Sequence, residues 1–158
     1  MKKKHKKAIR FISWILFIMY LVAMVYFLFF SEQLGRTPSD TYHYNLKPFA
    51  EINRYLTYYH KIGSFNVILN LLGNVICFMP FGFVIPILSC RQRSIVRITA
   101  LSFLCSVTIE LTQLVTKLGS CDVDDVILNT LGGISGYIIF CICFKIMHFY
   151  TDRKKKKK

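Results

Sequence analysis

The chain has 158 residues, of which 54% are hydrophobic and 15% aromatic, yet its formal net charge is +13. The length suits a single domain, but long apolar blocks alternate with short basic clusters, and this separation excludes an ordinary soluble domain. The lysines gather mainly at the two chain ends, and no nucleic-acid-binding motif is present, so we expect no nucleic-acid partner.

The first apolar block, residues 11–30, contains no charge, and six cations precede it in the basic segment 1–10. At ~1.5 Å per residue, a helix of this length crosses the ~30 Å hydrocarbon core of a bilayer. The block is too long for a signal peptide, and no small-residue cleavage site follows it. We therefore predict a retained transmembrane helix.

The segment that follows, residues 31–64, is polar with many aromatic residues. Within it Phe49, Ile52, Leu56 and Tyr59 recur at helical spacing, and charged residues lie between them. This pattern predicts a short amphipathic helix at the membrane surface.

Three more apolar blocks complete the chain and predict transmembrane helices at residues 65–88, 98–116 and 126–147. A short loop with three arginines joins the first two, and an acidic turn joins the last two. We predict an all-α integral membrane protein with one membrane domain, residues 11–147, followed by a basic tail, residues 148–158. The amphipathic helix would lie in its first outer loop.

The basic residues are unevenly distributed between the predicted loops. If the N-terminus is cytoplasmic, 16 of the 21 lysines and arginines lie on the cytoplasmic side. Cytoplasmic segments of membrane proteins carry such an excess. We therefore predict that both chain ends are cytoplasmic.

Polar residues recur every three or four positions in the last three predicted helices, so each set shares one helix face. The sets are Asn66, Asn70 and Asn74; Ser102, Ser106, Glu110, Gln113 and Lys117; and Asp125, Asn129, Gly132 or Gly133, and Gly136. Counted at ~1.5 Å per residue, the three faces meet roughly 6–10 Å below the outer surface. This arrangement predicts a small polar pocket open to the exterior.

Glu110 is the unusual member of these sets. A charged side chain at the bilayer centre costs at least ~2.5 kcal/mol, and the sequence places no cation within one helical turn of Glu110. We predict a functional role for it, whereas the asparagines are explained equally well by hydrogen bonds between helices. The predicted functional cluster comprises Asn70, Asn74, Glu110, Gln113, Asp122, Asp124, Asp125 and Asn129.

The acidic turn has two interpretations, which the sequence supports equally. Oxygen ligands from Asp122 and Asp124 suit a divalent cation. Asp125 is also suited to capping the start of the fourth helix, where negative charge is favourable.

Four motifs resemble those of the VanZ-like family of bacterial membrane proteins. They are Asn45 with Pro48 and Phe49; Asn70 and Asn74 followed by Phe78, Pro80 and Gly82; Ile109 and Glu110 followed by Gln113; and Asp122, Asp124 and Asp125 followed by Asn129, Thr130, Gly132 and Gly133. One departure is the stretch before the acidic turn, where the family often has an arginine and this chain has Leu118, Gly119, Ser120 and Cys121.

The resemblance implies a protein of a Gram-positive cytoplasmic membrane, associated with low-level resistance to glycopeptides of the teicoplanin type. We expect it to act at the outer face on a lipid or a lipid-linked envelope precursor. Two alternatives remain open: an enzyme that modifies a lipid or cell-wall precursor, and a non-enzymatic lipid transporter or assembly partner. Whether the chain is an enzyme is not decided by the sequence.

Overall fold

The computed structural model describes residues 3–30, 42–58 and 64–156. The α-helices in these residues are α1 (Lys3–Phe30), α2 (Ala50–Thr57), α4 (Ser64–Leu88), α5 (Ile95–Thr116) and α6 (Val123–Lys156). Four of them, all except α2, are long and apolar enough to cross a membrane. The predicted all-α membrane protein with four transmembrane helices is therefore confirmed.

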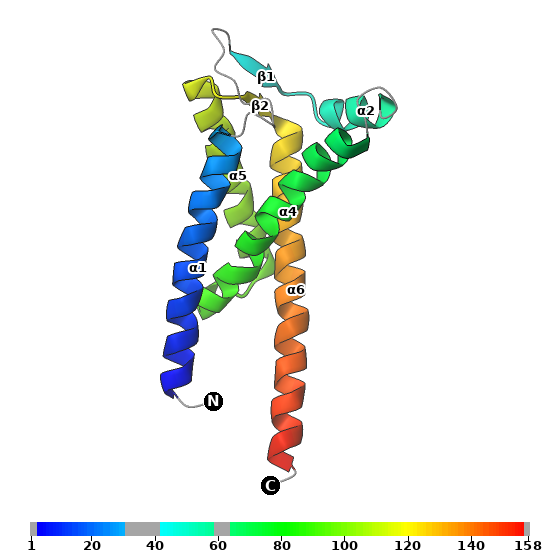
Figure 1. Cartoon of the computed structure of the whole chain (residues 1–158). Coiled ribbons are helices and arrows are strands. Elements are labelled where there is room, and N and C mark those ends of the chain that lie inside the picture. The colour runs from blue at the N-terminus through cyan, green and yellow to red at the C-terminus, as the bar shows by residue number, and fades with distance from the viewer. Residues whose placement is uncertain (1–2, 31–41, 59–63, 157–158) are drawn as a thin grey trace.

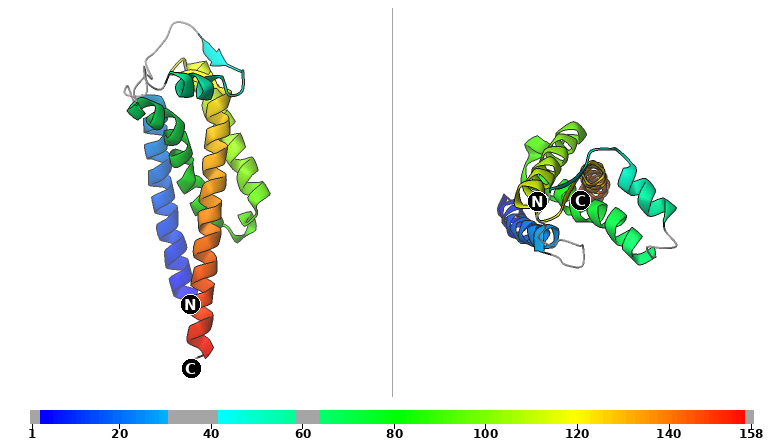
Figure 2. Two further views of the ribbon diagram at one scale, coloured as in Figure 1. Left: turned by 90° about the vertical axis from the view of Figure 1, so that its right-hand side faces the viewer. Right: turned by 90° about the horizontal axis from the view of Figure 1, so that it is seen from above.

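The long helix α6 is the central element of the bundle. It packs against α4 and α5, and α1 packs on α4 (Figure 1). The start of α1 and the end of α6 lie at one end of the bundle, which we call the terminal end. The opposite end carries α2 and two short strands, and we call it the sheet end (Figures 1 and 2).

Glycines allow α4 and α6 to approach until their backbones touch. A Cβ atom added at Gly82 of α4 would collide with the backbone of Gly133, and one added at Gly136 of α6 would collide with the carbonyl of Met79. Small residues at such crossings are the usual means of close packing between membrane helices. This crossing brings the polar faces of α4 and α6 together.

Apolar side chains join α1 to the rest of the bundle. Phe17 and Met24 of α1 are buried against Phe78 and Phe81 of α4. The Tyr20 hydroxyl donates a hydrogen bond of 2.7 Å to the backbone carbonyl of Cys77 in α4. Because membrane helices gain little from apolar burial alone, this bond also helps to hold α1 in place.

Two strands at the sheet end were not expected from the sequence. β1 (His43–Asn45) pairs in parallel with β2 (Ser120–Asp122), and Asn45 lies opposite Asp122. Three-residue strands are too short to show the alternation of apolar and polar residues that predicts a strand. The pairing places the segment before α2 directly against the acidic turn.

The predicted short helix of the first outer loop is present as α2, in which Ile52 is half-buried and Leu56 is exposed. Its position at a membrane surface stays a prediction, and Tyr59 lies outside the described residues. The fourth helix is longer than expected, because α6 begins at Val123 and continues to Lys156. Two residues of the predicted acidic turn, Asp124 and Asp125, therefore belong to its first helical turn.

Candidate functional site

Glu110 lies near the end of α5, and its side chain is only 3% exposed. After α5 the chain reverses through Lys117 and Gly119, both of which have positive φ, and returns as β2. This reversal brings the backbone N–H of Asp122 to Glu110, where it donates a hydrogen bond of 2.9 Å to Oε2. The Glu110 carboxylate thus fixes the return of the chain toward α6.

Asp122 connects three parts of the sheet end. Its Oδ1 accepts a hydrogen bond of 2.8 Å from the backbone N–H of Asp124, so Asp122 caps the first turn of α6. Its Oδ2 accepts a bond of 3.2 Å from the side-chain amide of Asn45 in β1. One of the two interpretations of the acidic turn assigned this cap to Asp125. The structure corrects it to Asp122, because α6 begins at Val123, one residue after Asp122.

Asp124 binds the N-terminus of a different helix. Its Oδ1 accepts the backbone N–H of Phe49 at 2.5 Å, and its Oδ2 accepts those of Glu51 and Ile52 at 2.8 and 3.1 Å. The side chain is 1% exposed. The N–H groups at the start of a helix have no partner within that helix and favour negative charge. Asp124 therefore holds α2 against the bundle.

Two further hydrogen bonds connect the polar faces of the helices. Asn74 of α4 donates to Oδ1 of Asp125 at 2.5 Å, and Asn129 of α6 donates to Oγ of Ser106 in α5 at 2.8 Å. Two other predicted members of the cluster lie on the same helices: Gln113 is fully buried, and Asn70 is half-buried one helical turn before Asn74.

The site contains partners that were not among the predicted functional residues. Asn45 and the first backbone amides of α2 lie more than 70 residues before the aspartates that they contact. The available signal was the motif of Asn45, Pro48 and Phe49, which resembled the family but indicated no contact. Because Asn45 and Asp122 are 77 residues apart in the chain, no local pattern could indicate that this motif contacts the acidic turn.

Burial changes the protonation of the acids at the sheet end. It raises the pKa of Asp122, and the hydrogen bonds from Asp124 and Asn45 partly oppose this rise. Burial also raises the pKa of Glu51 in α2, against the opposing effect of its 2.6 Å ion pair with Arg54. Proton uptake by Asp122 or Glu51 therefore occurs at a higher pH than it would in an unfolded chain.

The donors around the aspartates are N–H groups. The Asp122 and Asp124 carboxylates accept bonds from Asn45 and from the backbone of Asp124, Phe49, Glu51 and Ile52. Within the residues that the structure describes, no group of three or more His, Cys, Asp or Glu side chains is arranged to hold a metal ion. The hydrogen bonds account for both carboxylates in this structure, and a divalent cation at Asp122 and Asp124 stays a prediction.

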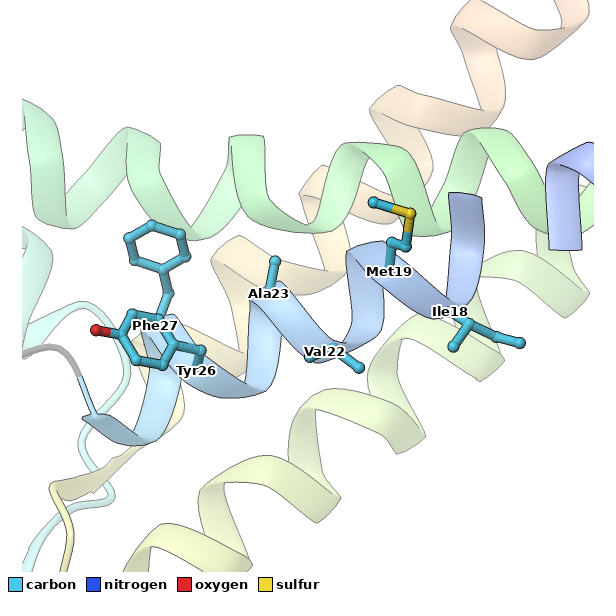
Figure 3. Close-up of a pocket in the computed structure, with 6 residues that line it drawn as sticks. All are labelled: Ile18, Met19, Val22, Ala23, Tyr26 and Phe27. Atoms are coloured by element: carbon cyan, nitrogen blue, oxygen red, sulfur yellow. The ribbon is translucent and has the colours of Figure 1, made fainter. Parts of the chain in front are cut away.

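Five of the eight residues in the predicted cluster are buried, and the other three, Asn70, Asn74 and Asp125, are half-buried. Glu110, Gln113, Asp122, Asp124 and Asn129 are each at most 6% exposed, in place of the open polar pocket expected from the sequence. A groove of about 520 Å³ does lie along α1, but its lining is Ile18, Met19, Val22, Ala23, Tyr26 and Phe27 (Figure 3). This groove is apolar and contains none of the predicted functional residues.

The fold and the site define a multi-pass helical membrane protein with a buried, hydrogen-bonded acidic cluster at one end of its bundle. A family model described as VanZ/LLP1 matches residues 17–144, and the chain therefore belongs to this family. Protein VanZ of Enterococcus faecium is 28% identical over 136 residues, which cover 84% of this chain and 76% of that protein. No solved structure matches the chain significantly.

Proposed function

We propose that this member of the VanZ family acts at the outer face of the cytoplasmic membrane, on a lipid or a lipid-linked envelope component. Its action would lower susceptibility to glycopeptides of the teicoplanin type. The positive-inside rule supports this orientation, because it assigns the lysine-rich terminal end to the cytoplasm and hence the sheet end to the exterior. The acidic cluster would then face the side from which such antibiotics approach.

The observation that carries the proposal is the burial of Glu110. The carboxylate is 3% exposed at the end of a membrane-spanning helix, and it accepts a backbone N–H of Asp122. The amide oxygen of a glutamine would accept the same bond without the cost of a buried charge. A carboxylate at this position therefore points to a role in which the charge or its proton takes part.

The first test is the Glu110→Gln variant, which keeps the shape of the side chain and its acceptor oxygen. We expect the teicoplanin resistance of cells that express this variant to fall to the level of cells without the protein, at unchanged abundance in the membrane. Thr112→Ala is the matched control, because Thr112 is exposed on the same helix. Its hydroxyl donates a hydrogen bond to the backbone carbonyl of Thr108, within α5. Full resistance in the Glu110→Gln variant would refute the proposal.

Mass spectrometry of co-purified lipids distinguishes the candidate mechanisms. A lipid that accompanies the wild type and is absent from Glu110→Gln preparations identifies the ligand. Chemical conversion of that lipid by the purified protein would assign an enzyme. Movement of the unchanged lipid across reconstituted vesicles would assign a transporter.

A further inference from the structure

The terminal end is strongly basic in its described residues. Exposed cations lie on α1, in and after the η2 turn (Cys90–Gln92), and on α6: Arg10, Arg91, Arg93, Arg97, Lys145 and Arg153. Of the acids in the part of the chain that the structure describes, Asp152 lies at this end and the others lie at the sheet end. The charge at the terminal end is therefore largely uncompensated by the protein itself.

Arg93 is held in a fixed position. Its guanidinium lies 4.6 Å from the ring centre of Phe144 and 5.5 Å from that of Phe140, both on α6. Its Nε donates a hydrogen bond of 3.1 Å to the backbone carbonyl of Pro86, at the end of α4. Contacts of this kind orient a guanidinium and limit its motion, while its terminal nitrogens remain available as donors.

Arg97 is anchored in a similar way on the first turn of α5. One of its terminal nitrogens donates to the backbone carbonyl of Arg91. Neither Arg93 nor Arg97 forms an ion pair with a carboxylate of the described chain, and both are exposed. Arg93 and Arg97 thus present two oriented guanidinium groups without a carboxylate partner among the described residues, four residues apart in the chain, and such groups suit phosphate, which accepts paired N–H bonds from arginine.

The depth of this site corresponds to lipid headgroups. At ~1.5 Å per residue, the part of α6 from Val123 to Phe144 is about 32 Å long. This length is close to the ~30 Å thickness of the hydrocarbon core. If the start of α6 marks one boundary of the core, Phe144 lies at the other, and the Arg93 guanidinium beside its ring is at the depth of the phosphates of the opposite leaflet.

We propose that Arg93 and Arg97 bind the phosphate of an anionic phospholipid in the leaflet at the terminal end. A topology signal needs only positive charge, whereas these two guanidinium groups are oriented by rings and backbone carbonyls. The arginine site lies at the opposite end of the bundle from the acidic cluster. A negative result for lipid binding would therefore leave the proposed function unaffected, and the reverse is also true.

The test measures how anionic lipid binds to the purified protein in detergent. Phosphatidylglycerol, phosphatidylcholine and inorganic phosphate are added separately, and the melting temperature and the lipid adducts in native mass spectrometry are recorded. We expect phosphatidylglycerol alone to raise the melting temperature of the wild type. Arg93→Gln should lower phosphatidylglycerol binding about fivefold, which corresponds to ~1 kcal/mol for one cation at a membrane surface.

Arg153→Gln is the matched control. Arg153 is also on α6 at the terminal end, and its guanidinium lies 4.4 Å from the ring centre of Phe149, but it is more than two helical turns beyond Phe144. This variant should keep the wild-type response. Each shift is measured against the variant's own lipid-free melting temperature, and Arg97→Gln repeats the test if Arg93→Gln does not fold.

Three results would overturn the proposal. Equal losses in Arg93→Gln and Arg153→Gln would mean a general attraction of charge. An equal response to phosphatidylcholine would remove the need for an anionic headgroup. An equal response to inorganic phosphate would assign the site to free phosphate instead of lipid.

Discussion

The three aspartates Asp122, Asp124 and Asp125 accept hydrogen bonds from four different parts of the chain. Asp122 accepts from the start of α6 and from Asn45, Asp124 from the start of α2, and Asp125 from Asn74 of α4. These distinct partners reduce the repulsion that three neighbouring carboxylates would otherwise suffer. The turn is therefore a junction of several elements.

Replacing Asp124 should affect stability more than replacing Asp125. Asparagine keeps one acceptor oxygen but turns an NH₂ group toward N–H donors, so Asp124→Asn should lower the free energy of unfolding by about 1–3 kcal/mol. In Asp125→Asn the remaining oxygen can still accept the bond from Asn74, so a loss of less than half as much is expected. Thermal unfolding in detergent measures both. Equal losses would contradict the assignment of Asp124 to the N-terminus of α2.

Among the elements, α2 is held at its start by an unusual backbone conformation. Phe49, which precedes the helix, has φ of 63°, a left-handed conformation that side chains with a Cβ disfavour. Its N–H nevertheless donates to Asp124, and its ring is mostly exposed. The bonds to Asp124 therefore compensate local strain.

A pair of variants isolates this strain. Phe49→Gly and Phe49→Ala both remove the ring, but glycine adopts positive φ at no steric cost. We expect the glycine variant to be more stable than the alanine variant by about 1 kcal/mol, as determined by chemical unfolding in detergent. The opposite order would show that the left-handed conformation is not kept in the membrane protein as purified.

The contact between α4 and α6 depends on glycine at specific positions. A Cβ at Gly82 would overlap the backbone of Gly133, whereas a Cβ at Gly73 of the same helix meets nothing within 4 Å. Gly82→Ala should therefore cost about 3 kcal/mol or more, or abolish folding. Gly73→Ala should be neutral or stabilising by up to ~1 kcal/mol, because alanine favours helix. Melting temperatures of the two purified variants test the packing, and similar values would contradict it.

At the scale of the whole molecule, charge is divided between the two ends of the bundle. Among the residues that the structure describes, all acids except Asp152 lie at the sheet end, and most exposed arginines and lysines lie at the terminal end, Lys47 and Arg54 being exposed at the sheet end. This division agrees with the positive-inside rule and predicts how the protein is oriented in the membrane.

Single-cysteine labelling tests the orientation. In a background without the six native cysteines, a membrane-impermeant reagent should label Thr57→Cys at the end of α2 in intact cells. It should not label Thr151→Cys near the end of α6 until the cells are opened. Thr57 and Thr151 are both exposed, so burial does not bias the comparison. Labelling of Thr151→Cys in intact cells would reverse the proposed orientation.

The sequence alone determined the four long helices, because transmembrane character depends on local composition over about 20 residues. It also placed Asn74, Glu110, Gln113 and Asn129 on inward-facing stripes, because helical spacing is a local property. Only the tertiary structure decided which groups these residues and the aspartates contact. Asn45 lies 77 residues from Asp122, and no local pattern records that β1 pairs with β2. These partners come from distant parts of the chain. The reversal after α5 and the pairing of β1 with β2 bring them together.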